Sequence, residues 1–189
     1  MMDFFGSKTI WGISLLILFG ILAVAGVADD DKEKHRNRES RHNDNNHNGD
    51  EYLKPVSNST YADQCGTCHF AYQPELLPAE SWRLILDGTE DHFEDTVDLD
   101  QDARREIERY LTSNAANTSS AELSRKIMRS LAGRLPLRIT NIPYIRKEHH
   151  ELPPQVIKQP SVGAWGNCIA CHRNAENGDY DDDRVSVPQ

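Results

Sequence analysis

The sequence predicts an all-α fold with little or no β structure, and three observations support this prediction. Three stretches place apolar residues at helical spacing, so each would form an amphipathic helix with one face to bury. No stretch shows a convincing pattern for paired strands. A long connecting segment, 134–160, contains five of the nine prolines, which rules out long regular elements there and indicates an extended segment wrapping the core.

Each predicted helix has a recognisable start or stop signal. The first begins after Pro78 and closes at Gly88. The second follows a capping-box pattern, Asp-Leu-Asp-Gln at 98–101, and the third follows another, Ser-Ser-Ala-Glu at 119–122, and stops at Gly133. The apolar residues expected to face inward are Trp82, Ile85 and Leu86, then Ala103, Ile107, Tyr110 and Leu111, then Leu123, Ile127 and Leu131.

The N-terminal stretch resembles an export signal. Lys8 supplies a positive start, residues 10–27 form an uncharged apolar run, and Gly26-Val27-Ala28 has the small-x-small form of a cleavage site. The apolar run also reaches the lower limit for spanning a bilayer. Residues 1–28 are therefore either a signal peptide or an uncleaved N-terminal anchor, the only contact with a membrane that we expect. Both alternatives place the rest of the chain outside the cytoplasm, and we expect a periplasmic protein.

The remaining chain divides by composition into three parts. Residues 29–51 are almost wholly polar and bury too little apolar surface to offset the entropy of ordering, so we expect a disordered tether. The folded domain is expected over 52–178, and the acidic run at 179–189 as a solvated tail. The net charge of −9 argues against nucleic acid as a partner, because phosphate binding needs a basic face.

All four cysteines fall into two copies of one pattern, Cys-Gly-Thr-Cys-His at 65–69 and Cys-Ile-Ala-Cys-His at 168–172. This C-x-x-C-H spacing is that of c-type haem attachment. Two thiols add to the two vinyl groups of a haem, and the following His lies under the iron as its proximal ligand. We therefore predict two covalently bound haem c groups in a haem-dominated domain. The attachment residues are Cys65, Cys68, Cys168 and Cys171, and the proximal ligands are His69 and His172.

Three other interpretations of the cysteines are weaker. A redox disulfide leaves the His that follows both pairs unexplained, and no thioredoxin-like pattern accompanies them. A zinc site with four thiolates would need pairs much closer together in the sequence. Structural disulfides suit an exported protein, but cysteines with only two residues between them rarely form them.

A haem that only carries electrons usually has a sixth ligand, either His or Met. Beyond residues 1–28 the only methionine is Met128, which lies in an apolar helical pattern where filling the core is its ordinary role. The histidines left in the folded part are His92, His149 and His150. His92 follows the first proximal His by 23 residues, and His149 precedes the second by the same number. We predict His92 as one distal ligand and one of the adjacent pair as the other, since neighbours cannot both face one iron.

A further set of residues extends the pattern beyond the two motifs: Tyr61-Ala62, Cys65 to Pro74, Leu76 to Ala79, Ser81-Trp82, His92 to Asp95, Ile107 to Leu111, Arg138-Ile139-Thr140, Glu148-His149 and Cys168 to His172. Through these residues the sequence resembles the dihaem cytochromes c of bacterial periplasms over nearly the whole of 52–178. The resemblance implies a mostly helical domain with two bis-histidine, low-potential haems, in which His92 and His149 are the distal ligands. It also implies electron exchange with a small high-spin monohaem cytochrome c and with membrane-bound b-type cytochromes.

These ligands predict an electron-transfer protein rather than an enzyme, with no catalytic residues. Two distal histidines for two irons leave neither haem with an open face. The alternative is a haem enzyme such as a dihaem peroxidase, which would need one displaceable distal ligand. A redox or gas sensor would need a second signalling domain, which we do not find in the sequence.

Overall fold

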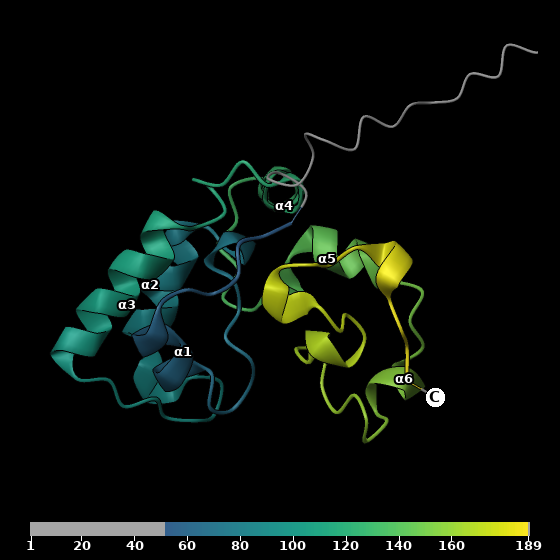
Figure 1. Cartoon of the computed structure of the whole chain (residues 1–189), viewed down its shortest axis with the longest axis horizontal. Helices are drawn as coiled ribbons and strands as arrows, with labels where there is room; N and C mark the ends of the chain where they lie inside the picture. Colours follow the sequence, from purple (N-terminus) through teal and green to yellow (C-terminus); the bar gives the residue numbers. More distant parts are fainter. Residues whose placement is uncertain (1–51, 189) are drawn as a thin grey trace, which may run out of the picture. The chain divides into compact units, whose positions relative to one another are not determined.

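The computed structural model describes residues 52–188; the predicted signal peptide or anchor, the tether and residue 189 lie outside the described residues. The described part contains six α-helices joined by loops and short 3-10 turns, and its one β feature is an isolated antiparallel bridge between His92 and Asp95 (Figure 1). The predicted all-α fold class is confirmed. Within residues 52–188, no helix has both the length and the apolarity to cross a membrane.

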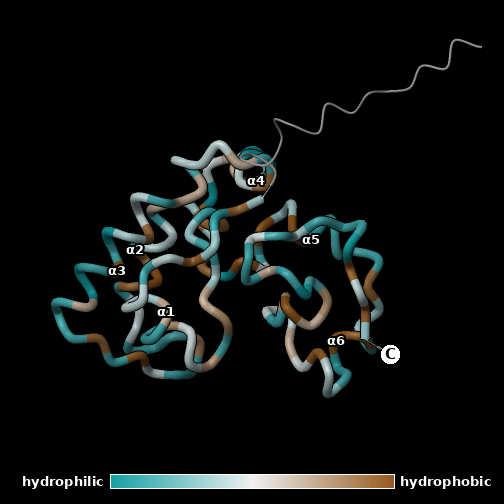
Figure 2. The backbone as a smooth tube through the Cα atoms, in the orientation of Figure 1, coloured by the Kyte–Doolittle hydropathy of each residue, from teal (hydrophilic) through white to brown (hydrophobic). Residues whose placement is uncertain are grey.

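Three helices from the first half of the domain pack together. Helix α3 (Gln101–Ser113) contacts both α1 (Ser59–Cys65) and α2 (Ala79–Asp87), and the three lie side by side in Figure 1. Polar and apolar residues alternate along α2 and α3, as amphipathic helices require (Figure 2). Their buried side chains include Tyr61, Trp82, Leu86, Ile107 and Leu111.

A second packing unit joins the middle of the chain to the first haem-attachment segment. Helix α4 (Glu122–Leu131) contacts α5 (Pro143–Glu148) and the 3-10 turn Pro74–Leu76 that follows the first motif. Ile127 is fully buried and belongs to the same apolar cluster as the core of α1–α3. Met128 packs against this cluster, in agreement with its predicted role in the core.

The start and stop signals were right for α2 and shifted for α3. Helix α2 begins directly after Pro78 and ends at Gly88, as predicted. The side chain that caps α3 is Asp100 rather than Asp98, since its carboxylate accepts the N–H groups of the second and third residues of the helix, each at 2.8 Å.

The capping box predicted for α4 does not form. The N-cap residue is Ala121, which offers no side-chain cap. The Ser119 hydroxyl accepts the Ala121 N–H at 3.1 Å and donates at 2.6 Å to the buried carboxylate of Glu75. The Ser119 hydroxyl, which the sequence pattern predicted as the helix cap, thus donates to a carboxylate 44 residues earlier in the chain.

The proline-rich segment contains only short helices. Both α5 and α6 (Pro154–Ile157) have a proline at the first helical position, where the missing N–H costs no hydrogen bond. Neither exceeds six residues.

The predicted acidic tail is exposed over residues 182–185, but other residues of the segment contact the domain. Tyr180 is half-buried, and its hydroxyl donates to Gln73 Oε1 at 2.6 Å. The Ser186 N–H donates to the Cys171 carbonyl at 3.0 Å, and Arg184 pairs with two aspartates of the same segment. Tyr180 therefore packs with the domain, where its hydroxyl satisfies the buried Gln73.

Candidate haem sites

The first motif lies at the end of α1, which stops at Cys65. Gly66 follows, and a Cβ atom at this position would stand 2.4 Å from the Ala62 carbonyl oxygen, so only glycine lets the chain turn here. The turn leaves Cys65 half-buried and Cys68 exposed, and it ends at His69. The small residue in the motif is therefore required by the backbone.

The structure brings His92 opposite His69. Their ring centres are 6.4 Å apart and the ring planes are 28° from parallel. His69 Nδ1 lies 2.8 Å from the Phe70 carbonyl oxygen, which only an N–H can satisfy, so Nε2 is the nitrogen left with a free lone pair. Partial burial, and then the nearby His69, lowers the pKa of His92 and keeps its imidazole neutral.

A tight turn holds His92 in place. The N–H of His92 donates to the Asp95 carbonyl at 2.7 Å, and the next two residues, Phe93 and Glu94, both have positive φ angles, 59° and 85°. The Arg138 guanidinium lies 3.8 Å from the centre of the Phe93 ring, a cation–π contact from the proline-rich segment. The first site is thus closed by residues far apart in the sequence.

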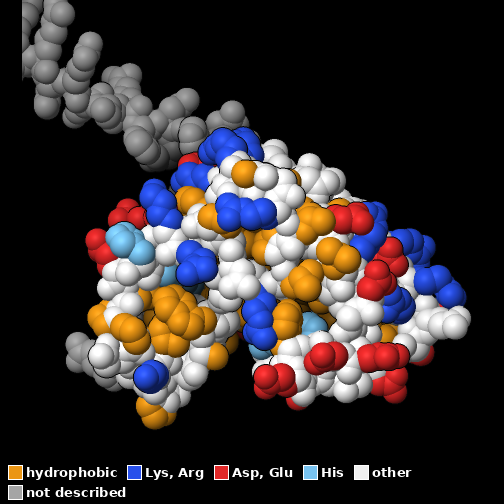
Figure 3. Space-filling model, turned by 180° about the vertical axis from the view of Figure 1, so that it is seen from behind, with side chains coloured by type: hydrophobic (Ala, Val, Ile, Leu, Met, Phe, Trp, Pro, Cys, Tyr) orange, Lys and Arg blue, Asp and Glu red, His pale blue; other side chains and the backbone are white. Residues whose placement is uncertain are grey.

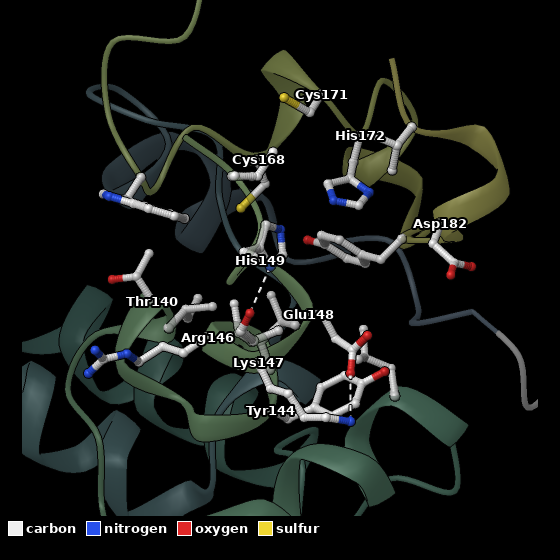
Figure 4. Close-up of a pocket in the computed structure, with 18 of the residues that line it drawn as sticks. Thr140, Tyr144, Arg146, Lys147, Glu148, His149, Cys168, Cys171, His172 and Asp182 are labelled. Atoms are coloured by element: carbon white, nitrogen blue, oxygen red, sulfur yellow. Dashed lines mark hydrogen bonds and ion pairs between the residues drawn. The ribbon is translucent and has the colours of Figure 1, made fainter. Parts of the chain in front are cut away.

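The second motif forms a 3-10 turn, Cys168–Ala170, which leads to His172. The ring of His172 faces that of His149, with centres 6.0 Å apart and planes at 59° (Figure 4). Both rings line a cavity of about 1230 Å³. Other residues that line this cavity are Tyr144, Trp165, Cys168, Cys171 and Tyr180.

The structure separates the two adjacent histidines. His149 ends α5, and its Nδ1 lies 2.7 Å from the Ile145 carbonyl oxygen, which leaves Nε2 free. His150 is exposed and lies 3.7 Å from the Glu151 carboxylate. Burial, followed by the nearby His149, lowers the pKa of His172, so the imidazole of His172 is neutral at pH 7.

No disulfide joins the four cysteines, all of which lie in the described residues. Burial raises the pKa of both Cys65 and Cys168 to about 11, so each is a neutral thiol at pH 7. In the part of the chain that the structure describes, no three His, Cys, Asp or Glu side chains are grouped to hold a metal ion by themselves, so the thiols do not form one zinc site.

The segment after the first motif also supports the second site, a link that sequence reasoning missed. The Tyr72 hydroxyl donates to the Gly166 carbonyl at 2.5 Å, just ahead of the second motif. The Gln73 side chain is fully buried; it donates to the Ala175 carbonyl at 2.6 Å and accepts from Tyr180. The ring of Tyr180 lies 5.7 Å from that of His172. The only sequence signal was a polar Gln inside an otherwise apolar and aromatic stretch.

The residues present fit haem iron. Two imidazoles that bind one iron from opposite sides place their ring centres roughly 6 Å apart, because each metal–nitrogen bond is about 2 Å long and each ring adds about 1 Å. Both ring pairs have this spacing, and each lies beside a C-x-x-C thiol pair. The fold and the two sites define the class: a helical c-type haem protein with two attachment sites.

Within this class the chain belongs to the dihaem cytochrome c family, whose sequence profile matches residues 61–180. It is similar to the diheme cytochrome c from Rhodobacter sphaeroides, with 34% identity and a TM-score of 0.57 over 68% of this chain and 99% of the other. A diheme cytochrome type c from Shewanella baltica OS155 is 35% identical, with a TM-score of 0.57 over 69% of this chain and 93% of the other. No curated protein matches the chain.

Family membership confirms the predicted cofactors, two c-type haems with their irons. It also confirms the broad functional prediction, that the chain is a haem-binding electron-transfer protein. The ligands of each iron stay predictions, and we take them up next.

Proposed function

We propose that this chain is a periplasmic electron carrier in which each iron is held by two histidines, His69 with His92 and His172 with His149. The observation that carries the proposal is the pair of facing imidazoles beside each C-x-x-C motif, at 6.4 and 6.0 Å between ring centres. The thiols that would attach the haems are Cys65 and Cys68 at the first site and Cys168 and Cys171 at the second.

A bound haem supplies one-electron chemistry between ferrous and ferric iron. The chain's own residues determine whether that chemistry serves electron transfer or catalysis. Two imidazoles would hold each iron, so a substrate would find no vacant site. Histidine in place of methionine keeps the potential low. The carbonyls that accept from His69 and His149 fix each ring's orientation, as outer-shell partners of metal ligands do. These features support carriage rather than catalysis.

Partners and location follow from the resemblance and from the N-terminal pattern. We place the protein in the periplasm, released or anchored by residues 1–28. Its proposed partners are a small monohaem cytochrome c and a membrane b-type cytochrome.

The adjacent histidines offer a matched test of the ligands. In the purified dihaem protein, His149→Ala should convert one haem from low-spin to high-spin, while His150→Ala should leave the absorption and EPR spectra unchanged. His92→Ala should convert the other haem. A high-spin haem in His150→Ala, or unchanged spectra in His149→Ala, would contradict the assignment.

One observation favours the second candidate, a haem enzyme with a displaceable ligand. The turn that holds His92 has two consecutive non-glycine residues with positive φ, a conformation that costs about 1–2 kcal/mol per residue. Release of His92 would relieve this strain, whereas His149 ends a regular helix. Carbon monoxide added to the reduced protein tests it, because only a haem that loses its distal ligand binds the gas. Binding abolished in a variant that lacks the first haem would support this candidate.

A further inference from the structure

The charge of the domain is unevenly distributed. Residues 123–147 contain seven basic side chains and no acidic one, in a chain whose net charge is −9. The flanking residues 52–122 hold five basic and fourteen acidic side chains, and 148–188 hold three basic and seven acidic. We name the basic side chains of 123–147 the basic strip: Arg125, Lys126, Arg129, Arg134, Arg138, Arg146 and Lys147.

The basic strip is available at the surface. All its members are exposed except Lys126, which is half-buried and pairs with Glu122 at 2.7 Å. The strip follows α4, the loop after it, and α5, which packs against α4. Figure 3 shows Lys and Arg side chains over the region of α4 and down the middle of this face, with hydrophobic side chains between them.

The strip borders both candidate haem sites on their distal sides. At one end, Arg138 lies on the Phe93 ring, whose centre is 4.7 Å from that of His92. At the other end, Arg146 lies on the same short helix that ends at His149. A partner bound to the strip would therefore lie next to the distal ligand of either haem.

The strip also has the composition of a protein interface. Two leucines between its arginines are conspicuously exposed, Leu135 at 45% and Leu137 at 43%. An apolar centre within a charged rim rich in arginine is typical of protein–protein contacts. Five of the seven basic residues are arginines.

We propose that the basic strip is the docking surface for an acidic redox protein. The inference rests on the proposed function, because it explains how a carrier with a net charge of −9 would bring its haems close to a partner. Local charge steers the encounter of two proteins, so the field at the haem edges matters more than the net charge. The net charge alone would favour a basic partner. The positive charge of the basic strip, which lies beside both distal histidines, favours an acidic one.

Two charge-matched variants test the proposal. Arg125→Glu with Arg129→Glu reverses two exposed members of the strip, both on α4. Arg105→Glu with Arg109→Glu reverses two exposed arginines of α3 as the control. Each reversal changes the charge by two units, so both variants move from −9 to −13. Neither pair contains a proposed haem ligand, and unchanged absorption spectra would verify intact sites.

The probe is an acidic single-haem cytochrome c in its oxidised form. In stopped-flow mixing, one electron passes from a ferrous haem of this protein to the ferric haem of the probe. At low ionic strength we expect the strip variant to react about tenfold more slowly than wild type, and the control to change by less than about twofold. The difference should vanish at high salt, where screening shortens the reach of both surfaces. Equal losses in both variants, or no loss in either, would overturn the proposal.

Two further measurements separate the remaining outcomes. The cation tris(phenanthroline)cobalt(III) should oxidise wild type and both variants, without a loss of rate in the strip variant. If it oxidises none of them, the proposed carrier function is wrong, and the result does not bear on the docking surface. Flotation with phosphatidylglycerol vesicles tests an anionic lipid surface. If the strip variant loses vesicle binding while its electron-transfer rate with the cytochrome equals that of wild type, the strip binds lipid and the docking proposal is wrong.

Discussion

Gln73 follows the first haem-attachment motif, and its hydrogen bond to Tyr180 supports the second haem site. Removing this bond should therefore destabilise the second site. In Gln73→Leu the side-chain volume is nearly kept, but the Tyr180 hydroxyl and the Ala175 carbonyl lose partners that are each 2.6 Å away. A third bond, from Gln73 Nε2 to the Glu176 carbonyl at 3.2 Å, is lost as well, while the Ala175 carbonyl keeps the N–H of Gly178. Each hydrogen bond contributes about 1 kcal/mol net, so the three bonds predict a loss of about 3 kcal/mol in the free energy of unfolding. Tyr180→Phe leaves only Gln73 Oε1 without this donor and should cost about 1 kcal/mol.

The double variant makes the test specific. Because the shared bond is counted in both single changes, the double variant should lose about 1 kcal/mol less than their sum. The assay is urea unfolding of the dihaem protein followed by far-UV circular dichroism, with an unchanged m-value as the condition for comparison. Tyr110→Phe is the control, since its hydroxyl accepts only an exposed N–H, from Ser57 at 3.1 Å. Additive losses would refute the coupling through this bond.

Two other predictions concern attachment and folding. Replacing both Cys65 and Cys68 with Ala should leave one covalently bound haem after acid–acetone extraction, measured as the pyridine haemochrome; two retained haems would contradict attachment at this motif. Asp100→Ala should lower the free energy of unfolding by about 1 kcal/mol through loss of the helix cap, whereas Asp98→Ala, two residues earlier, should have no such effect in urea titrations.

The features that the sequence predicted well depend on neighbours in the chain. The limits of α2 were correct because Pro78 cannot continue a helix backwards and Gly88 ends one without help from other elements. The two C-x-x-C-H motifs are likewise local, since attachment chemistry fixes their spacing. The position of His149 opposite His172 could be predicted by counting residues, because the domain contains few histidines.

The features that the sequence did not predict depend on contacts between residues far apart in the chain. Ser119 has the right spacing for a cap, but the buried Glu75 carboxylate takes its hydroxyl. The acidic run after 178 has the composition of a solvated tail, yet Tyr180 within it satisfies a glutamine 107 positions earlier. A composition argument weighs all residues of a segment alike, whereas here Tyr180 is half-buried while Asp182 and Asp183 are exposed.

The order of the proposed ligands in the sequence explains why the two sites would depend on one another. At the first site the attachment motif precedes its opposing histidine, and at the second site the motif follows it, so both His92 and His149 lie between the two motifs. The intervening chain must therefore form the distal side of both sites, and it includes the loop with Arg138 that closes the turn beside His92. A simple tandem repeat would give each site its own distal segment and independent stability. In this topology, a change in the loop between α4 and α5 reaches both pairs of rings, and a surface on that loop lies beside both.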